Sequence, residues 1–146
     1  MLRIAIINGP NLNLLGTREV DIYGGKSFDE FLTSLRQKYP DISFSYYQSN
    51  VEGELINRLQ ECNGTVDGIV FNGAGYTHTS VSIADAIAAI STPVLEVHIS
   101  NIHAREEYRH HSLTSSKCVG SITGLGLIGY ELAVNYFIET SAAKTS

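Results

Sequence analysis

Short runs of aliphatic and β-branched residues alternate with amphipathic stretches along the whole 146-residue chain. This alternation is typical of βαβ units, in which parallel strands are joined by helices that cover the sheet. We predict strands at residues 3–8, 42–48, 66–72, 94–99 and 118–123, and helices at 27–38, 52–62, 80–90 and 127–139. The expected fold class is therefore α/β, a flavodoxin-like three-layer sandwich with a five-stranded parallel sheet. One core of ordinary size accounts for this length, so residues 1–146 should form a single domain.

The composition argues against several classes of protein. Hydrophobic residues make up 43% of the chain and charged residues 17%, which predicts a packed core rather than disorder. Fifteen acidic residues against ten basic ones give a net charge of -5, which argues against nucleic-acid binding, because a phosphate backbone needs a basic surface. No apolar run approaches the length of a membrane span, and the first residues lack a signal-peptide pattern. We therefore expect a cytoplasmic protein that binds no membrane.

Two connections are longer than the usual link between a strand and a helix. They span residues 9–26 and 100–117, and both mix aromatic with charged residues, as functional loops often do. Ligands of an open parallel sheet bind beyond the carboxyl ends of its strands. The polar residues that follow the first, third and fourth predicted strands are Asn11, Arg18, Tyr23, Asn72, His78, Glu96, His98 and Ser100. We expect these side chains to meet at one edge of the sheet.

Taken singly, the same residues have simpler explanations. Asn72 alone suits a turn, and His98 equally suits a hydrogen-bonded core histidine. The run GLGLIG (124–129) matches a dinucleotide-binding pattern, but only 17 residues follow it, too few for the next strand and its ribose-binding acid. A tight turn and close helix packing explain these glycines better.

Metal binding has little support in the sequence. Cys62 and Cys118 form no CxxC pair, which predicts neither a zinc site nor a disulfide framework and fits a reducing compartment. We interpret both as small core residues. The adjacent His110 and His111 would point to different sides of a helix, so with His103 they are not expected to converge on one ion.

Several segments of the chain resemble type II 3-dehydroquinate dehydratases. They are GPNLNLLGTRE (9–19), IYG (22–24), QSN with EGELI (48–56), THTSVSIADAI (77–87), EVHISNIHAREEYRHHS (96–112) and GLGLIGYELA (124–133). The resemblance implies a flavodoxin-like fold and a hydro-lyase that converts 3-dehydroquinate to 3-dehydroshikimate and water through an enolate. It implies neither a metal, nor a cofactor, nor a Schiff base. It also implies a homo-oligomer, with trimers grouped into dodecamers.

The resemblance also implies roles for individual residues. Tyr23 matches the base, Arg18 its neighbouring arginine, His98 the general acid, and Asn11 the asparagine that holds an enolate-stabilising water. The matches to substrate contacts are Asn72, His78, Ile99, Ser100, Arg109 and Asp85, the last of which reaches in from an adjacent subunit.

These residue types suit the elimination of water. The pKa of free tyrosine is about 10, and an arginine within about 4–6 Å lowers such a pKa by about 1–3 units, so Arg18 is a plausible activator of Tyr23. Histidine, with an ordinary pKa of about 6.5, suits a proton donor. Glu96, two residues before His98, should share its face of the strand and orient it. The amides of Ile99 and Ser100 lie where the next helix is expected to begin, a favourable place for a carboxylate.

Three positions depart from the family pattern. Gly73 and Val20 stand where proline is usual, and Val51 stands where histidine is frequent. None of the three is a proposed catalytic group, so the departures concern the rigidity of the loops rather than the reaction.

The alternative function is a flavin- or nucleotide-binding flavodoxin-like module. A phosphoacceptor signalling domain is a third hypothesis, but it needs an aspartate where this chain has Asn72.

Overall fold

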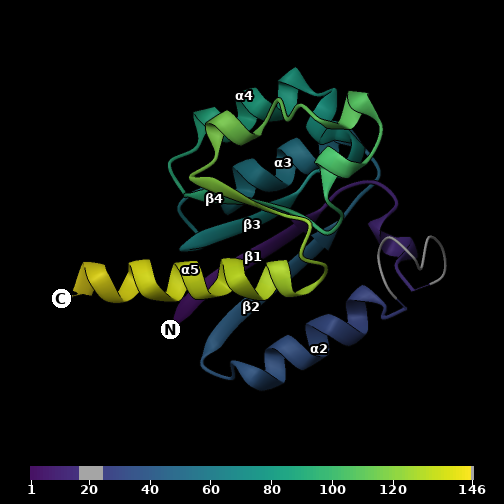
Figure 1. Ribbon diagram of the computed structural model, residues 1–146. Coiled ribbons are helices and arrows are strands. Elements are labelled where there is room, and N and C mark those ends of the chain that lie inside the picture. Colours follow the sequence, from purple (N-terminus) through teal and green to yellow (C-terminus); the bar gives the residue numbers. More distant parts are fainter. Residues whose placement is uncertain (17–24, 146) are drawn as a thin grey trace.

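Five parallel strands form one sheet in this computed structural model, which describes residues 1–16 and 25–145 (Figure 1). The strands are β1 (Leu2–Asn8), β2 (Ile42–Gln48), β3 (Gly68–Asn72), β4 (Val94–His98) and β5 (Gly120–Thr123). Their order across the sheet is β2-β1-β3-β4-β5. This is the flavodoxin-like order, in which the direction of winding reverses between β1 and β3. The predicted fold class is confirmed.

Within the described residues, four α-helices cover the two faces of the sheet (Figure 1). Helices α2 (Phe28–Lys38) and α5 (Ile128–Thr145) lie on one face, and α3 (Glu52–Cys62) and α4 (Val81–Ala89) lie on the other. Each lies where the sequence predicts a helix, although α5 continues beyond residue 139. Ser27 caps α2 as predicted, because its hydroxyl accepts a hydrogen bond from the backbone N–H of Glu30 at 3.2 Å.

The alternation of side chains along β1 divides the hydrophobic residues into two cores. Ile4 and Ile6 pack with α2 and α5, whereas Ala5 and Ile7 pack with α3 and α4. Strand β3 is buried along its whole length, as expected for a central strand of a parallel sheet. Helices therefore cover both faces of the central strands, and β3 and β4 are buried along their whole length.

The glycine-rich run before α5 has the structural role predicted for it. Gly124 and Gly126 have positive φ angles of 87° and 69° and form the turn after β5. A Cβ atom on Gly129 would lie 3.3 Å from Val97 Cγ1, so this glycine lets α5 approach β4 closely.

No helix in the described ranges, 1–16 and 25–145, has both the length and the apolar character to cross a membrane.

Gly68→Ala should lower the free energy of unfolding, since its Cβ would lie 2.6 Å from the ring of buried Phe137 on α5. Overpacking of this kind costs about 1–3 kcal/mol. The control is Gly53→Ala at the start of α3, where nothing lies within 4 Å of the added Cβ, so its effect should be neutral or stabilising by less than about 1 kcal/mol. Urea titrations measure both, and equal stabilities would contradict the close packing of α5 on β3.

Candidate active site

A cavity of about 160 Å³ lies beyond the carboxyl ends of β1, β3 and β4. It brings together most of the polar residues that the sequence singles out. The predicted site residues that line it are Asn11, Asn72, His78, His98, Ile99, Ser100 and Arg109. Leu12, Leu15 and Ile102 form apolar parts of its wall. The expected convergence at one edge of the sheet is confirmed for Asn11, Asn72, His78, His98 and Ser100.

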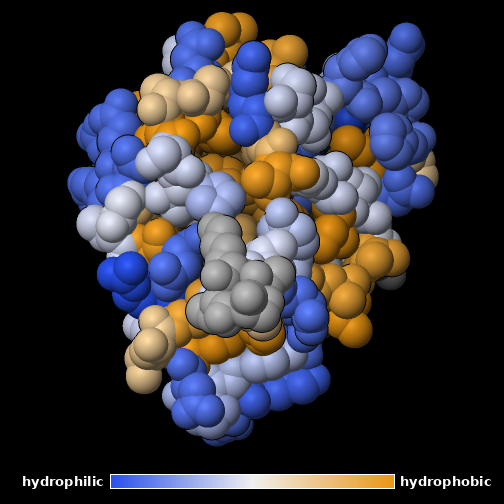
Figure 2. All heavy atoms as spheres, turned by 90° about the vertical axis from the view of Figure 1, so that its left-hand side faces the viewer, coloured by the Kyte–Doolittle hydropathy of each residue, from blue (hydrophilic) through white to orange (hydrophobic). Residues whose placement is uncertain are grey.

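A second cavity, of about 400 Å³, lies at the opposite end of the sheet, between the ends of α2 and α5. Hydrophilic and hydrophobic side chains are interspersed on this face of the molecule (Figure 2). Two of its polar residues, Lys38 and Tyr39, already contact Glu131, at 2.5 and 2.7 Å. No predicted site residue within the described ranges lines this second cavity, so the first is the candidate active site.

Two predicted site residues that the structure describes, Glu96 and Asp85, do not line the first cavity. Tyr23 and Arg18, together with Val20, lie outside the described residues. Glu96 is buried behind His98. Asp85 is exposed on α4 and does not border the cavity of its own chain.

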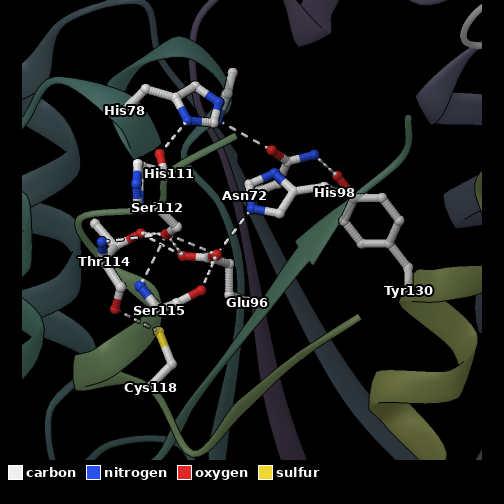
Figure 3. A network of polar contacts seen from close by, with 11 residues as sticks. Asn72, His78, Glu96, His98, His111, Ser112, Thr114, Ser115, Cys118 and Tyr130 are labelled. Atoms are coloured by element: carbon white, nitrogen blue, oxygen red, sulfur yellow. Dashed lines mark hydrogen bonds and ion pairs between the residues drawn. The ribbon is translucent and has the colours of Figure 1, made fainter. Parts of the chain in front are cut away.

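His98 and Glu96 form a buried hydrogen-bonded pair on β4 (Figure 3). Their side chains are on the same face of the strand, as predicted, with His98 Nε2 2.8 Å from Glu96 Oε2. Only 4% of His98 and 1% of Glu96 is exposed. Because a carboxylate can only accept, Nε2 carries a proton and Nδ1 is the ring nitrogen left for a ligand.

Three hydroxyl groups surround the same carboxylate, and we call them the hydroxyl cradle (Figure 3). Ser112 and Ser115 approach Glu96 Oε2 at 3.0 and 2.7 Å, and Thr114 donates to Oε1. Burial by itself raises the pKa of Glu96, but the hydrogen bonds from His98, Thr114 and Ser115 and the charge of His98 outweigh it. Together they lower the pKa of Glu96 to about 2. Glu96 is thus a fixed negative charge beside His98.

His78 lies opposite His98, with ring centroids 6.3 Å apart. Its Nδ1 donates to the backbone carbonyl of His111 at 2.6 Å. Burial lowers the pKa of His78, and His98 and Arg109 lower it further, although the bond to His111 opposes them. His78 is therefore neutral at pH 7, with Nε2 available as a hydrogen-bond acceptor.

The turn after β3 presents Asn72 at the cavity. Asn72 Oδ1 accepts from the backbone N–H of Ala74 at 3.0 Å, and Ala74 has a positive φ of 52°, an uncommon conformation for a residue with a Cβ. Gly73 has a φ of -74°, close to the value that proline would impose. The turn therefore keeps the geometry expected of proline at this position. The third departure, Val51, is exposed just before α3 and makes no side-chain cap.

The connection after β4 differs from its sequence prediction. No regular helix begins at Ile99 or Ser100; a 3₁₀-helix of three residues (Ile102–Ala104) follows instead, with Asn101 as its cap. The expected helix-terminus site for an anion is therefore wrong. Positive charge comes from side chains: Arg105, whose Nη1 donates to Ser100 Oγ at 3.3 Å, and Arg109, whose Nε donates to Glu106 at 2.7 Å.

The cysteines behave as core residues. Burial, with the neighbouring charge of Glu96, raises the pKa of the Cys118 thiol to about 12, and burial also raises the pKa of Cys62. Neither is a nucleophile near neutral pH. In the part of the chain that the structure describes, no three His, Cys, Asp or Glu side chains are arranged to hold a metal ion.

The sequence prediction missed five residues that shape the site: Arg105, Ser112, Thr114, Ser115 and Tyr130. Arg105 is in the charged segment that was singled out for function, but its spacing does not distinguish it from its neighbours. The run SLTSS (112–116) carries a weak signal, because clustered hydroxyls follow two histidines. Nothing in the local pattern marks Tyr130. It is 58 residues from Asn72 in the sequence and contacts it only in the folded chain.

Comparisons with known proteins give one consistent result. A model of the Dehydroquinase class II family matches residues 2–138. A 3-dehydroquinate dehydratase of Fusobacterium nucleatum is 54% identical over 144 residues and aligns with 94% of this chain and 97% of that protein. A 3-dehydroquinate dehydratase of Campylobacter jejuni is 49% identical over 140 residues, 94% of this chain and 88% of that protein. The crystal structure of a type II dehydroquinase from Butyrivibrio crossotus matches with a TM-score of 0.89 and 44% identity, over 93% of this chain and 97% of that one.

Glu96→Gln should remove a pH-dependent part of the stability. The folded-state pKa of about 2 lies below the ordinary value of 4.5, so the stabilisation is complete above pH 4.5 and is lost as the pH falls towards 2. A shift of this size corresponds to about 3 kcal/mol. Denaturant titrations at successive pH values should show a steeper acid loss of stability in the parent than in the variant. The control is Glu139→Gln, at an exposed glutamate, whose stability should depend on pH as that of the parent does. If the stability of Glu96→Gln also shows the parent's pH dependence, Glu96 does not have the lowered pKa.

Proposed function

This chain belongs to the class II dehydroquinase family, and on that premise we propose that its cavity removes water from 3-dehydroquinate through an enolate. The chain is a 3-dehydroquinate dehydratase, a hydro-lyase, as its relatives are named. The observation that carries the proposed mechanism is the buried Glu96–His98 pair, of which His98 lines the cavity. The relatives favour this activity over a flavin- or nucleotide-binding module.

Tyr23 is proposed as the base that removes the proton next to the ketone. A tyrosine must lose its own proton to act in this way, and a nearby guanidinium stabilises the phenolate. Arg18, five residues earlier in the chain, is proposed for this part. Asn11, which lines the cavity, then holds a water that donates to the enolate oxygen.

His98 is proposed as the general acid that protonates the leaving hydroxyl. Its Nε2 is occupied by Glu96, so the proton is delivered from Nδ1, which holds one only when the ring is an imidazolium. Glu96 Oε2 lies 2.8 Å from Nε2 and places a negative charge beside the ring. The low pKa of Glu96 supports this role, because a protonated glutamic acid would not stabilise the cation.

The remaining contacts are proposed to hold the substrate. Its carboxylate requires positive charge and hydrogen-bond donors, which Arg109, Ser100 and the backbone amide of Ile99 supply at the cavity wall. Its hydroxyl groups require acceptors as well as donors. Neutral His78 provides an acceptor at Nε2, and the amide of Asn72 provides both kinds of group.

We further propose one catalytic domain of residues 1–146 that needs neither metal nor cofactor and works in the cytoplasm. The reaction would serve aromatic amino acid biosynthesis by the shikimate pathway, or quinate breakdown. The exposure of Asp85, away from the cavity of its own chain, supports a homo-oligomer in which this carboxylate completes the site of an adjacent subunit. By the family resemblance that assembly is a dodecamer built from trimers.

Tyr23→Phe should abolish turnover and leave substrate binding within a few-fold of the parent, because only the base is removed. The assay follows the ultraviolet absorbance of the conjugated enone product formed from 3-dehydroquinate, and calorimetry measures binding. Activity like that of the parent would exclude Tyr23 as the base.

Borohydride added together with substrate should not inactivate the parent enzyme, because the enolate mechanism forms no imine with a lysine. Covalent trapping of substrate on Lys26 or Lys117 would replace the enolate mechanism with an imine mechanism.

Asp85→Ala should raise KM about tenfold, the effect of losing one charged hydrogen bond to substrate. Light scattering on the parent should give a particle much larger than the 15.9 kDa chain. In mixed oligomers of Asp85→Ala and Tyr23→Phe chains, some sites combine Tyr23 of the first chain with Asp85 of the second. These sites hold both native residues and should show the parent KM. A fully active monomer, or no recovery on mixing, would contradict a shared site.

A further inference from the structure

Tyr130 joins the two asparagines that end β1 and β3. It lies in the first turn of α5, with none of its surface exposed. Its hydroxyl donates to Asn8 Oδ1 at 2.7 Å and accepts from Asn72 Nδ2 at 2.9 Å. Figure 3 shows the phenol reaching Asn72 beside His98. Asn8 and Asn72 are neighbours in the sheet, so a single hydroxyl contacts both strand ends.

These contacts allow only one orientation of the Asn72 amide. Its oxygen faces the backbone N–H of Ala74, and its nitrogen faces the oxygen of Tyr130. The hydroxyl proton of Tyr130 is committed to Asn8, whose own amide nitrogen donates to Tyr46 at 3.2 Å. Rotating the Asn72 amide by half a turn would set its NH₂ group against the N–H of Ala74, two donors facing each other.

The glycine-rich run explains how the phenol reaches this position. Gly129, the residue before Tyr130, lies so close to the sheet that a Cβ would meet Val97 Cγ1 at 3.3 Å and Ile122 Cγ2 at 3.4 Å. The ring of Tyr130 is then held by Phe28, with centroids 5.0 Å apart. The run that resembles a nucleotide-binding loop thus serves to bring α5 close to β4 and β5.

We propose that Tyr130 is a positioning residue for substrate recognition, because it fixes the Asn72 amide in the orientation that leaves one N–H for a substrate hydroxyl. This inference rests on the proposed function, since it takes 3-dehydroquinate as the molecule that Asn72 contacts. Tyr130 itself does not line the cavity. Its effect on the reaction passes through Asn72, which distinguishes it from His98, the proposed general acid.

The test compares two substitutions that each remove one hydroxyl from the same chain of hydrogen bonds. Tyr130→Phe removes the hydroxyl that accepts a hydrogen bond from Asn72 Nδ2. Tyr46→Phe removes the hydroxyl that accepts from Asn8 Nδ2 and leaves the contact with Asn72 in place. We expect Tyr130→Phe to raise KM about tenfold while kcat falls less than about threefold. Tyr46→Phe should change both constants less than about twofold. A purely structural role would lower the amount of active enzyme in both variants and leave KM unchanged.

Binding measured without turnover separates this inference from the proposed function. In the Tyr23→Phe background, calorimetry with 3-dehydroquinate should show about tenfold weaker binding when Tyr130→Phe is added. Normal affinity and KM in Tyr130→Phe, or equal effects of Tyr46→Phe, would overturn the positioning role while leaving the dehydratase intact. Failure of the parent chain to bind or turn over 3-dehydroquinate would overturn both proposals.

Gly129→Ala supplies a second variant that keeps every hydroxyl. Its added Cβ pushes α5 away from Val97, so it should raise KM in the same direction as Tyr130→Phe. If Tyr130→Phe does not fold, Gly129→Ala tests the proposal instead. A raised KM with an unchanged kcat in Gly129→Ala would support it. An unchanged KM, in a variant whose crystal structure shows α5 displaced, would reject it.

Discussion

The parallel register of β1, β3 and β4 is the constraint on which the site depends. Asn8 pairs with Asn72, and Phe71 pairs with Glu96, so the three strands end close together. Beyond these ends the backbone ladder stops and polar side chains must satisfy one another. Residues from distant parts of the sequence therefore share one cavity.

Polar groups at this edge form two hydrogen-bonded systems on opposite faces of the sheet. On the face of α2 and α5, Tyr130 connects Asn8 and Asn72. On the face of α3 and α4, the hydroxyl cradle surrounds Glu96, which bonds His98. A buried carboxylate is costly unless several donors surround it. The cradle provides such donors and keeps Glu96 negatively charged beside His98 near neutral pH.

The long connection after β4 serves both the cavity and the cradle. Its first half carries Arg105 and Arg109 to the cavity wall, and its second half carries Ser112, Thr114 and Ser115 to Glu96. A single α-helix presents residues at fixed angular intervals and could not turn one half to the cavity and the other to the strand. Three short 3₁₀-helices (Ile102–Ala104, Glu107–Arg109 and Ser115–Lys117) do this instead.

The sequence by itself determined the fold class, the order of elements and the strand residues that reach the cavity. Hydrophobic periodicity reports which face of an element is buried, and strand polarity places Asn72, Glu96 and His98 at one edge. The sequence predicts a turn with close packing at the glycine run, because too little chain follows it for a dinucleotide site, and the structure confirms this. Asp85 remained a match by resemblance, since one chain does not contain its neighbour.

Only the tertiary structure decided which groups support the site residues. Tyr130 is 58 residues from Asn72, and Thr114 is 18 from Glu96, so no local pattern links either pair. The sequence also predicts a helix that begins at Ile99 or Ser100, whereas a short 3₁₀-helix begins only at Ile102. Residue propensity does not report that the segment after β4 has to contact both the cavity and Glu96. Hydrogen bonds between buried side chains depend on distances of a few tenths of an ångström, and packing of α5 and the long loop against the sheet sets those distances.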